Sequence, residues 1–266
     1  MPEVAPAGAG PRIVVAARGA VTTIALGHPP ANALSLDFLD EITAAAHQAR
    51  ALARTRVVVV SSTLPRIFMA GADLEARDAG DNPAGPFVAA LHRAFGAIEA
   101  LAVPTIAAVG GHALGGGCEL ALACDFRVMA RGEARIGLPE VRLGLLAAGG
   151  GTQRLVRLVG RATATDLLLR GRALGADEAR AVGLVHETCD PGELDATVAE
   201  LAEELSRLPP LALAAAKRLI REGPEVPFGE AVALEAAAMA ELEPTEDARE
   251  GVRAFLERRP GVFRGR

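Results

Sequence analysis

Two glutamates stand in segments of the chain that are otherwise small or apolar. Glu119 lies two residues after the glycine run of ALGGGCELALA, and Glu140 lies directly after a proline in GLPEVRLGL. Burying a carboxylate costs free energy unless it is hydrogen-bonded or used, so each glutamate is a candidate general acid or base. Two structural alternatives stay open: a surface Glu119 that favours the helix dipole, and Arg142 as an ion-pair partner of Glu140.

Two glycine-containing segments are candidates to present backbone amides to a ligand. The chain leaves a predicted strand through Ala70, Gly71, Ala72 and Asp73, and it enters a predicted helix through the glycines at 115–117. A helix start carries unpaired N–H groups and the positive end of the dipole, and glycine permits close approach to the backbone. Such amides bind anions or stabilise a carbonyl oxygen that gains negative charge. The alternative is that these glycines serve close packing.

The rest of the composition excludes several classes of catalyst. The chain has no Trp or Tyr, and its single lysine, Lys217, lies in AAAKRL rather than in a phosphate-binding loop. None of its serines occupies a GxSxG motif, and the chain contains no HExxH, CxxC or strand-following GxGxxG motif. These absences argue against serine hydrolases, zinc enzymes, P-loop proteins and dinucleotide-binding folds, and we expect no metal site.

Charge and hydropathy indicate the general class of protein. The 266 residues carry a net charge of −5, which argues against bulk nucleic-acid binding. No uninterrupted apolar run reaches about eighteen residues, and the first residues, MPEVAPAGAGP, lack the pattern of a secretory signal. We therefore expect a cytoplasmic protein with neither a nucleic-acid nor a membrane partner.

Hydrophobic periodicity predicts α/β alternation followed by helices alone. After a flexible tail over residues 1–11, we expect a hairpin, a helix, a buried strand, a second helix, a strand, and then a loop, helix and strand. The corresponding ranges are 12–17 with 21–26, 36–52, 57–60, 87–101, 104–109 and 110–130. A helix entered through three glycines follows at 149–160, and helices alone are expected from about residue 190.

Several of these motifs, in this order, resemble the crotonase (enoyl-CoA hydratase/isomerase) superfamily. The matching stretches are NALS, FMAGADL, PTIAAVGGHALGGGCELALACDFRVMA, PEVRLGL, GGTQRLVRLVGRATATDLLLRG, ADEARAVGLVHE and EDAREGVRAFLERRPGVF. The resemblance implies a spiral of ββα turns over residues 12–190 and a helical trimerisation region over 191–266. It also implies a homotrimer or a dimer of trimers.

The resemblance implies specific roles for the candidate residues. The amides of Ala72 and Gly116 would form the oxyanion hole for a thioester carbonyl, and Glu119 and Glu140 match the two catalytic glutamates of enoyl-CoA hydratases. The implied reaction adds water to a 2-enoyl-CoA thioester, with coenzyme A as part of the substrate and no other cofactor. Two alternatives stay open. One is a Δ3,Δ2-enoyl-CoA isomerase, and the other is an acyl-CoA-binding or RNA-binding homologue with little activity.

Other positions of the motif are expected to bind or shape the substrate. These positions are Ala70, Gly71, Asp73, Met69, Ala148 and Arg66, of which Met69 is expected to narrow or reshape the acyl pocket. Arg66, with Arg258, Arg259, Arg264 and Arg266, is a candidate contact for the CoA phosphates, and a solvated basic surface stays open as the alternative for these arginines. Relatives commonly have Pro-Gly where this chain has Ala147 and Ala148, so we expect an altered loop there, with the Ala148 amide still able to hold a water molecule.

Overall fold

The computed structural model describes residues 11–78, 80–81 and 83–266, so residues 1–10 of the predicted tail lie outside the described part. Six strands form the larger sheet, in the order β1 (Ile13–Arg18), β2 (Val21–Leu26), β3 (Val57–Ser62), β5 (Thr105–Val109), β7 (Phe126–Ala130) and β10 (Glu187–Cys189). The β1–β2 hairpin is antiparallel, as the sequence predicts, and the other neighbours are parallel. Four short strands form a second sheet, in the order β4 (Ile67–Met69), β6 (His112–Leu114), β8 (Ile136–Gly137) and β9 (Ala173–Leu174).

Successive strand pairs alternate between the two sheets. The strands β3, β5 and β7 belong to the larger sheet, and the strand that follows each of them, β4, β6 or β8, belongs to the smaller one. Helical structure follows each pair: α2 (Leu74–Asp78) and α3 (Ala84–Glu99), then α4 (Gly116–Ala123), then the 3-10 helix η1 (Glu140–Leu143) and α5 (Gly151–Arg170). This repeated ββα unit confirms the predicted spiral.

The larger sheet is buried on both faces, which explains the unbroken valine run at its centre. Val58 and Val60 face the main core beneath α1 (Leu36–Ala51) and α3, while Val57 and Val59 face a second core covered by α7 (Leu194–Arg207). Parallel strands covered on both sides lack polar alternation for this reason. The predicted helix at 36–52 is confirmed as α1, and the Ser35 hydroxyl caps it by accepting the Phe38 N–H at 3.2 Å.

Two expected helices differ at their boundaries. The strand expected before Ala70 is β4, whereas β6, β8 and β9 are not predicted. The third helix, α3, begins at Ala84 rather than at residue 87, and α5 begins at Gly151 and continues to Arg170. Gly160 has φ +76°, so it interrupts α5 and divides it into two helical segments. Strands of two or three residues, such as β6, β8 and β9, offer too few positions for a period-two pattern. Their pairing partners are also distant in sequence, so no local turn signal marks them.

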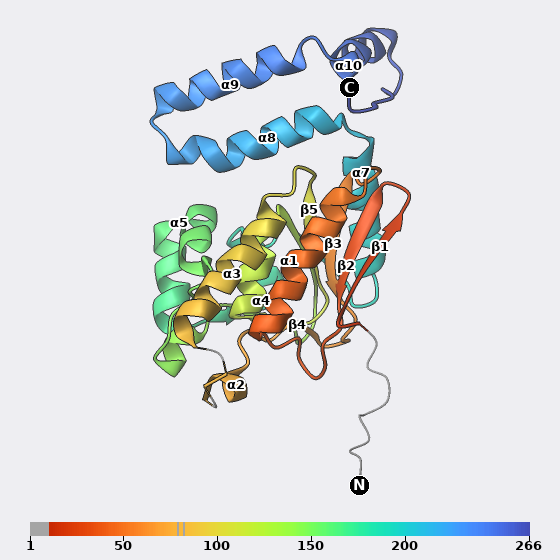
Figure 1. Cartoon of the computed structure of the whole chain (residues 1–266). Helices are drawn as coiled ribbons and strands as arrows, with labels where there is room; N and C mark the ends of the chain where they lie inside the picture. Colours follow the sequence, from red (N-terminus) through yellow and green to blue (C-terminus); the bar gives the residue numbers. More distant parts are fainter. Residues whose placement is uncertain (1–10, 79, 82) are drawn as a thin grey trace.

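The last quarter of the chain is helical, as the sequence predicts. After α6 (Ala176–Ala181) and β10 come α7, α8 (Pro210–Glu222), η2 (Gly223–Glu225), α9 (Phe228–Leu242) and α10 (Glu246–Glu257). Figure 1 shows α8 and α9 side by side, extending beyond the sheets. Large apolar side chains stay uncovered on these helices within the single chain: Phe228 is 84 % exposed and Phe255 is 83 % exposed.

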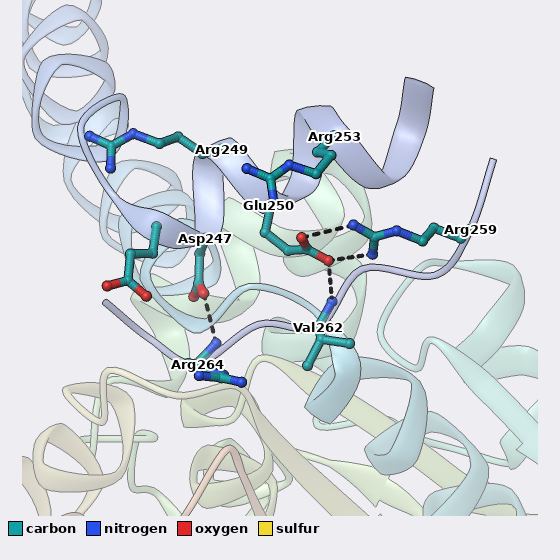
Figure 2. A pocket seen from close by; sticks show the side chains of 8 residues that line it. Asp247, Arg249, Glu250, Arg253, Arg259, Val262 and Arg264 are labelled. Carbon is teal, nitrogen blue, oxygen red and sulfur yellow. Dashed lines mark hydrogen bonds and ion pairs between the residues drawn. The ribbon is translucent and has the colours of Figure 1, made fainter. Parts of the chain in front are cut away.

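The C-terminal segment folds back against α10. Glu250 forms an ion pair with Arg259 and accepts the Val262 N–H, while the Asp247 carboxylate accepts the amides of Arg264 and Gly265 (Figure 2). These residues surround an open cavity of about 420 Å³. Among the residues that the structure describes, none of the helices combines the length and hydrophobicity of a membrane span.

Candidate active site

A second cleft of about 420 Å³ opens beside the first turn of α4. Its polar lining is the backbone at residues 70–72 and 115–116 together with the carboxyl groups of Glu119 and Glu140. Its apolar lining comes from α2, α3 and the segment after η1, chiefly Leu74, Phe87, Val88, Leu91, Leu145 and Leu146. The cleft therefore combines a few convergent polar groups with an apolar wall, as small-molecule sites generally do.

Two glycine segments meet on one side of this cleft. Gly71 has φ +101°, and a Cβ placed on it would lie 3.3 Å from the Gly116 nitrogen, so the two glycine segments touch. Leu34 pairs with this turn by donating its N–H to the Gly71 carbonyl at 2.8 Å and accepting the Asp73 N–H at 3.0 Å. Within the described chain, neither the Ala72 N–H nor the Gly116 N–H has a backbone acceptor.

The position of Gly116 explains why its amide is free. It is the first residue of α4, where an N–H group has no partner within the helix. The preceding Gly115 adopts φ +54°, a conformation that favours glycine, and directs the chain into the helix. A methyl group at Gly117 would overlap the Met69 carbonyl oxygen, so the start of α4 also presses closely against β4.

Glu119 is buried, with 2 % of its surface exposed, and its carboxylate is held by the loop that leads into α5. Its Oε1 accepts the Gly151 N–H at 2.8 Å, and the nearby Gly149 amide favours the ionised form of the carboxyl group. Burial raises the pKa of Glu119 to about 7, with a further contribution from the charge of Glu140, while the two amides and Arg154 oppose the rise. Glu119 is therefore poised to exchange a proton near neutral pH.

Glu140 approaches the same amides from η1. A Cβ on Gly115 would lie 3.1 Å from its Oε1, which places the carboxyl group against the turn that carries the Gly116 amide. Its Oε2 is buried and has no hydrogen-bond partner in the described chain, and burial raises the pKa of this carboxyl. Arg142 does not pair with it, because the Arg142 Nε donates to the Arg170 carbonyl at 3.2 Å.

Comparison with known proteins identifies the family to which this site belongs. The family described as Enoyl-CoA hydratase/isomerase matches residues 16–266. The chain belongs to this family. It is 40 % identical over 239 residues to the human mitochondrial methylglutaconyl-CoA hydratase, a match that covers 88 % of this chain and 70 % of the relative.

Further relatives agree over nearly the whole chain. The short-chain-enoyl-CoA hydratase of Clostridium acetobutylicum is 36 % identical over 249 residues, which is 93 % of this chain and 95 % of that protein. The crystal structure of an enoyl-CoA hydratase from Geobacillus kaustophilus HTA426 superposes with a TM-score of 0.92 at 35 % identity, covering 97 % of this chain and 98 % of the other. The protein is thus an enzyme of the enoyl-CoA hydratase type, a hydro-lyase of CoA-thioester metabolism, and the predicted crotonase fold is confirmed.

Most of the residues singled out in the family motifs come together, but three do not line the cleft. Met69 is fully buried in the main core, so the expectation that its side chain narrows the acyl pocket is wrong. Asp73 caps α2, since its Oδ1 accepts the Ala76 N–H at 3.0 Å. Arg66 is exposed on the segment before β4. Ala70, Gly71 and Ala148 do line the cleft.

The C-terminal arginines lie far from this cleft in the same chain. Figure 1 shows α10 at the end of the molecule opposite α2, which borders the cleft. Arg259 is paired with Glu250, and Arg266 is paired with Glu246 at 2.9 Å. Within one chain these arginines therefore do not reach the substrate cleft.

The apolar wall and the anchor of Glu119 are not predicted from the sequence. Phe87, Val88 and Leu91 lie at helical spacing within the helix predicted over 87–101, but this pattern does not indicate that the helix borders the cleft. The glycine pattern at Gly149 and Gly151 predicts only a helix entrance, although a Cβ on either would lie 2.6 Å or 2.8 Å from a Glu119 carboxylate oxygen. That close approach joins segments about 30 residues apart, and only the folded chain shows it.

Proposed function

We propose that the enzyme adds water syn across the C2=C3 bond of a 2-enoyl-CoA thioester to give a 3-hydroxyacyl-CoA. The observation that supports this most strongly is the pairing of two carboxyl groups, Glu119 and Glu140, around one cleft that also presents the free amides of Ala72 and Gly116. An isomerase that moves one proton needs a single acid–base group. The presence of two such groups therefore favours hydration.

In this proposal the two amides stabilise the charge that develops on the substrate. Attack of water at C3 places negative charge on the thioester oxygen, and in this proposal the free N–H groups of Ala72 and Gly116 donate to that oxygen. Donors of this kind act without reorganisation, and removing one typically lowers the rate ~10²–10³-fold. Ala72 lies two residues before α2 and Gly116 is the first residue of α4, and both positions leave the N–H without a partner in regular structure within the described chain.

The two carboxyl groups divide the proton transfers. Ionised Glu119 takes a proton from the attacking water, which the Ala148 amide helps to hold, while protonated Glu140 gives its proton to C2. Burial raises the pKa of both carboxyl groups, that of Glu119 to about 7, which supports roles in proton transfer for this pair. Transfer of the proton from Glu119 to Glu140 then restores the starting state, and this scheme uses only groups of the protein.

The lining of the cleft supports an apolar acyl group of short or medium length. Leu74, Phe87, Leu91, Leu145 and Leu146 surround the space beyond the carboxyl groups. Exposed Arg66 stays a candidate contact for the phosphates of the CoA moiety. Because named relatives include a methylglutaconyl-CoA hydratase and a short-chain-enoyl-CoA hydratase, the choice between a carboxylated and an uncharged acyl group needs direct measurement.

The test is hydration of crotonyl-CoA, followed by loss of the conjugated enoyl-thioester absorbance. Rapid loss supports the proposal, and comparison with longer and with carboxylated 2-enoyl-CoA esters then ranks the acyl groups. Gain of conjugation from a 3-enoyl-CoA, without hydration of crotonyl-CoA, would instead identify an isomerase. Binding of the esters without turnover of any of them would identify an acyl-CoA-binding homologue.

The proposal includes a homotrimer or a dimer of trimers in the cytoplasm. The support for assembly is the set of apolar side chains left exposed on α8, α9 and α10, including Ile220, Phe228 and Phe255. Surfaces of this kind usually mark protein contacts. Light scattering at micromolar concentration should give the mass of a trimer or hexamer, and a monodisperse monomer would contradict this part of the proposal.

A further inference from the structure

A hydrogen bond joins α3 to the loop that anchors Glu119. The His92 Nε2 lies 2.7 Å from the Ala148 carbonyl oxygen, and since a carbonyl only accepts, Nε2 carries the proton. His92 is exposed on α3, next to Leu91 of the cleft wall, and Ala148 lines the cleft from the opposite segment. The bond therefore links two segments that line the cleft, although the His92 side chain itself is exposed.

His92 bonds to the peptide unit between Ala148 and Gly149, which lies against Glu119. The Ala148 carbonyl and the Gly149 N–H belong to a single planar peptide, so fixing the oxygen also fixes the direction of the N–H. The Gly149 amide favours the ionised form of the Glu119 carboxyl group and so lowers its pKa. This peptide has little room to move, because a Cβ on Gly149 would lie 2.6 Å from Glu119 Oε2 and 2.8 Å from the Phe95 ring.

A second contact holds the next carbonyl of the same loop. Arg154 Nη1 donates to the Gly149 oxygen at 2.9 Å, and the guanidinium is itself held by Glu99 of α3 through two bonds of 2.9 Å. Consecutive carbonyl groups are thus tied to α3, directly by His92 and through Arg154 by Glu99. These bonds restrain a loop that has Ala147, rather than a proline, at its start.

We propose that His92 is a positioning residue for Glu119, acting through the Ala148–Gly149 peptide. The inference rests on the proposed function only in taking Glu119 as the base of the reaction. His92 itself need not touch the substrate. Its imidazole donates to the Ala148 carbonyl oxygen. This bond orients the Gly149 N–H of the same peptide towards the Glu119 carboxylate and polarises that N–H.

The role of His92 can be measured through the pKa of Glu119, which also depends on the charged groups around it. Glu140 faces it from η1, Arg154 from α5 with Glu99 of α3 behind it, and the thiol of Cys118 adjoins it on α4. Loss of the His92 bond leaves these groups in place but loosens the Gly149 amide. Because that amide favours the ionised carboxylate, its loss raises the pKa of Glu119 further.

The experiment compares His92→Leu, which lacks the donor, with His92→Gln, whose side-chain amide can donate from about the position of the imidazole Nε2. His47→Leu, at another exposed histidine on a helix, is the matched control. We expect His92→Leu to lower kcat about threefold to tenfold, the range for one lost hydrogen bond, with KM within twofold. The acid limb of its pH–kcat profile should move to higher pH, and His92→Gln should restore most of both properties.

A second readout separates this inference from the proposed function. In protein labelled with carbon-13 at the glutamate carboxyl groups, the resonance of Glu119 is assigned by its absence in Glu119→Gln and titrated in each variant. An upward shift in His92→Leu but not in His92→Gln or His47→Leu supports the positioning role, even if crotonyl-CoA is not hydrated. No shift, or equal shifts in the two His92 variants, would overturn the role, and it would do so without affecting a measured hydratase activity.

Discussion

The cleft and the C-terminal helices are built in opposite ways. Around the cleft the backbone itself is the functional surface: glycines 71, 116, 149 and 151 have neighbours too close to admit side chains freely, and the two carboxyl groups are largely withdrawn from water. On α8 to α10, large apolar side chains face outward and the charges pair at the surface. The difference shows that the single chain brings the polar groups of the cleft together but leaves apolar side chains of the helical region uncovered.

The largest expected effect comes from the carboxyl groups of the cleft. Glu140→Gln keeps the size of the side chain but cannot deliver a proton to C2, so kcat for hydration of crotonyl-CoA should fall ~10²–10⁴-fold. Binding of a saturated acyl-CoA, measured by calorimetry, should stay within a few-fold of the wild type. Near-normal turnover would remove Glu140 from the proposed mechanism.

The next effect tests whether a backbone amide is the functional group. Gly116→Pro deletes the proposed oxyanion donor and should lower kcat ~10²–10³-fold. Gly116→Ala is the control, because it retains the N–H while adding a methyl group that meets the buried Leu34 side chain. Circular dichroism checks that both variants fold, and equal losses in two folded variants would assign the effect to the added carbon atoms rather than to the amide.

A smaller effect concerns stability and comes from burying Glu119. Its pKa is about 7 in the folded protein against an ordinary value of 4.5, so the folded state binds the proton more tightly. Stability should therefore decrease as the pH rises from about 4.5 to 7, by about 3 kcal/mol in total. Urea unfolding of Glu119→Gln should lack this part of the pH dependence, and an unchanged pH dependence would contradict the raised pKa.

The smallest effect on the chain itself should come from the helical region. Phe255 is 83 % exposed, so Phe255→Asp removes little packing within one chain, and the circular dichroism spectrum should be unchanged. Burying the new charge in the proposed assembly is costly, so light scattering should show a smaller mass than for the wild type at the same concentration. An assembly as stable as the wild type would place the subunit contact elsewhere.

The sequence predicted the larger elements because each carries a local pattern. The hairpin, α1, the valine strand and α4 all have a recognisable period or turn, and the ββα spiral follows from the family motifs in order. The strands β6, β8 and β9 escaped prediction, since two or three residues have no usable period. Met69 was misplaced because its motif position gives the order of residues but not the direction of a side chain, which points into the core.

The sequence by itself determined the candidate chemistry: two glutamates in apolar surroundings, glycine segments that expose amides, and motifs that specify a crotonase spiral. Only the tertiary structure decided which groups cooperate. The Gly151 N–H donates to the Glu119 carboxylate, and the Gly149 amide lowers its pKa. Arg142 bonds to the Arg170 carbonyl instead of Glu140, and His92 donates to the Ala148 carbonyl. The physical reason is that pKa values and hydrogen bonds depend on distances between segments remote in sequence, and these distances exist only after the sheets and helices have packed.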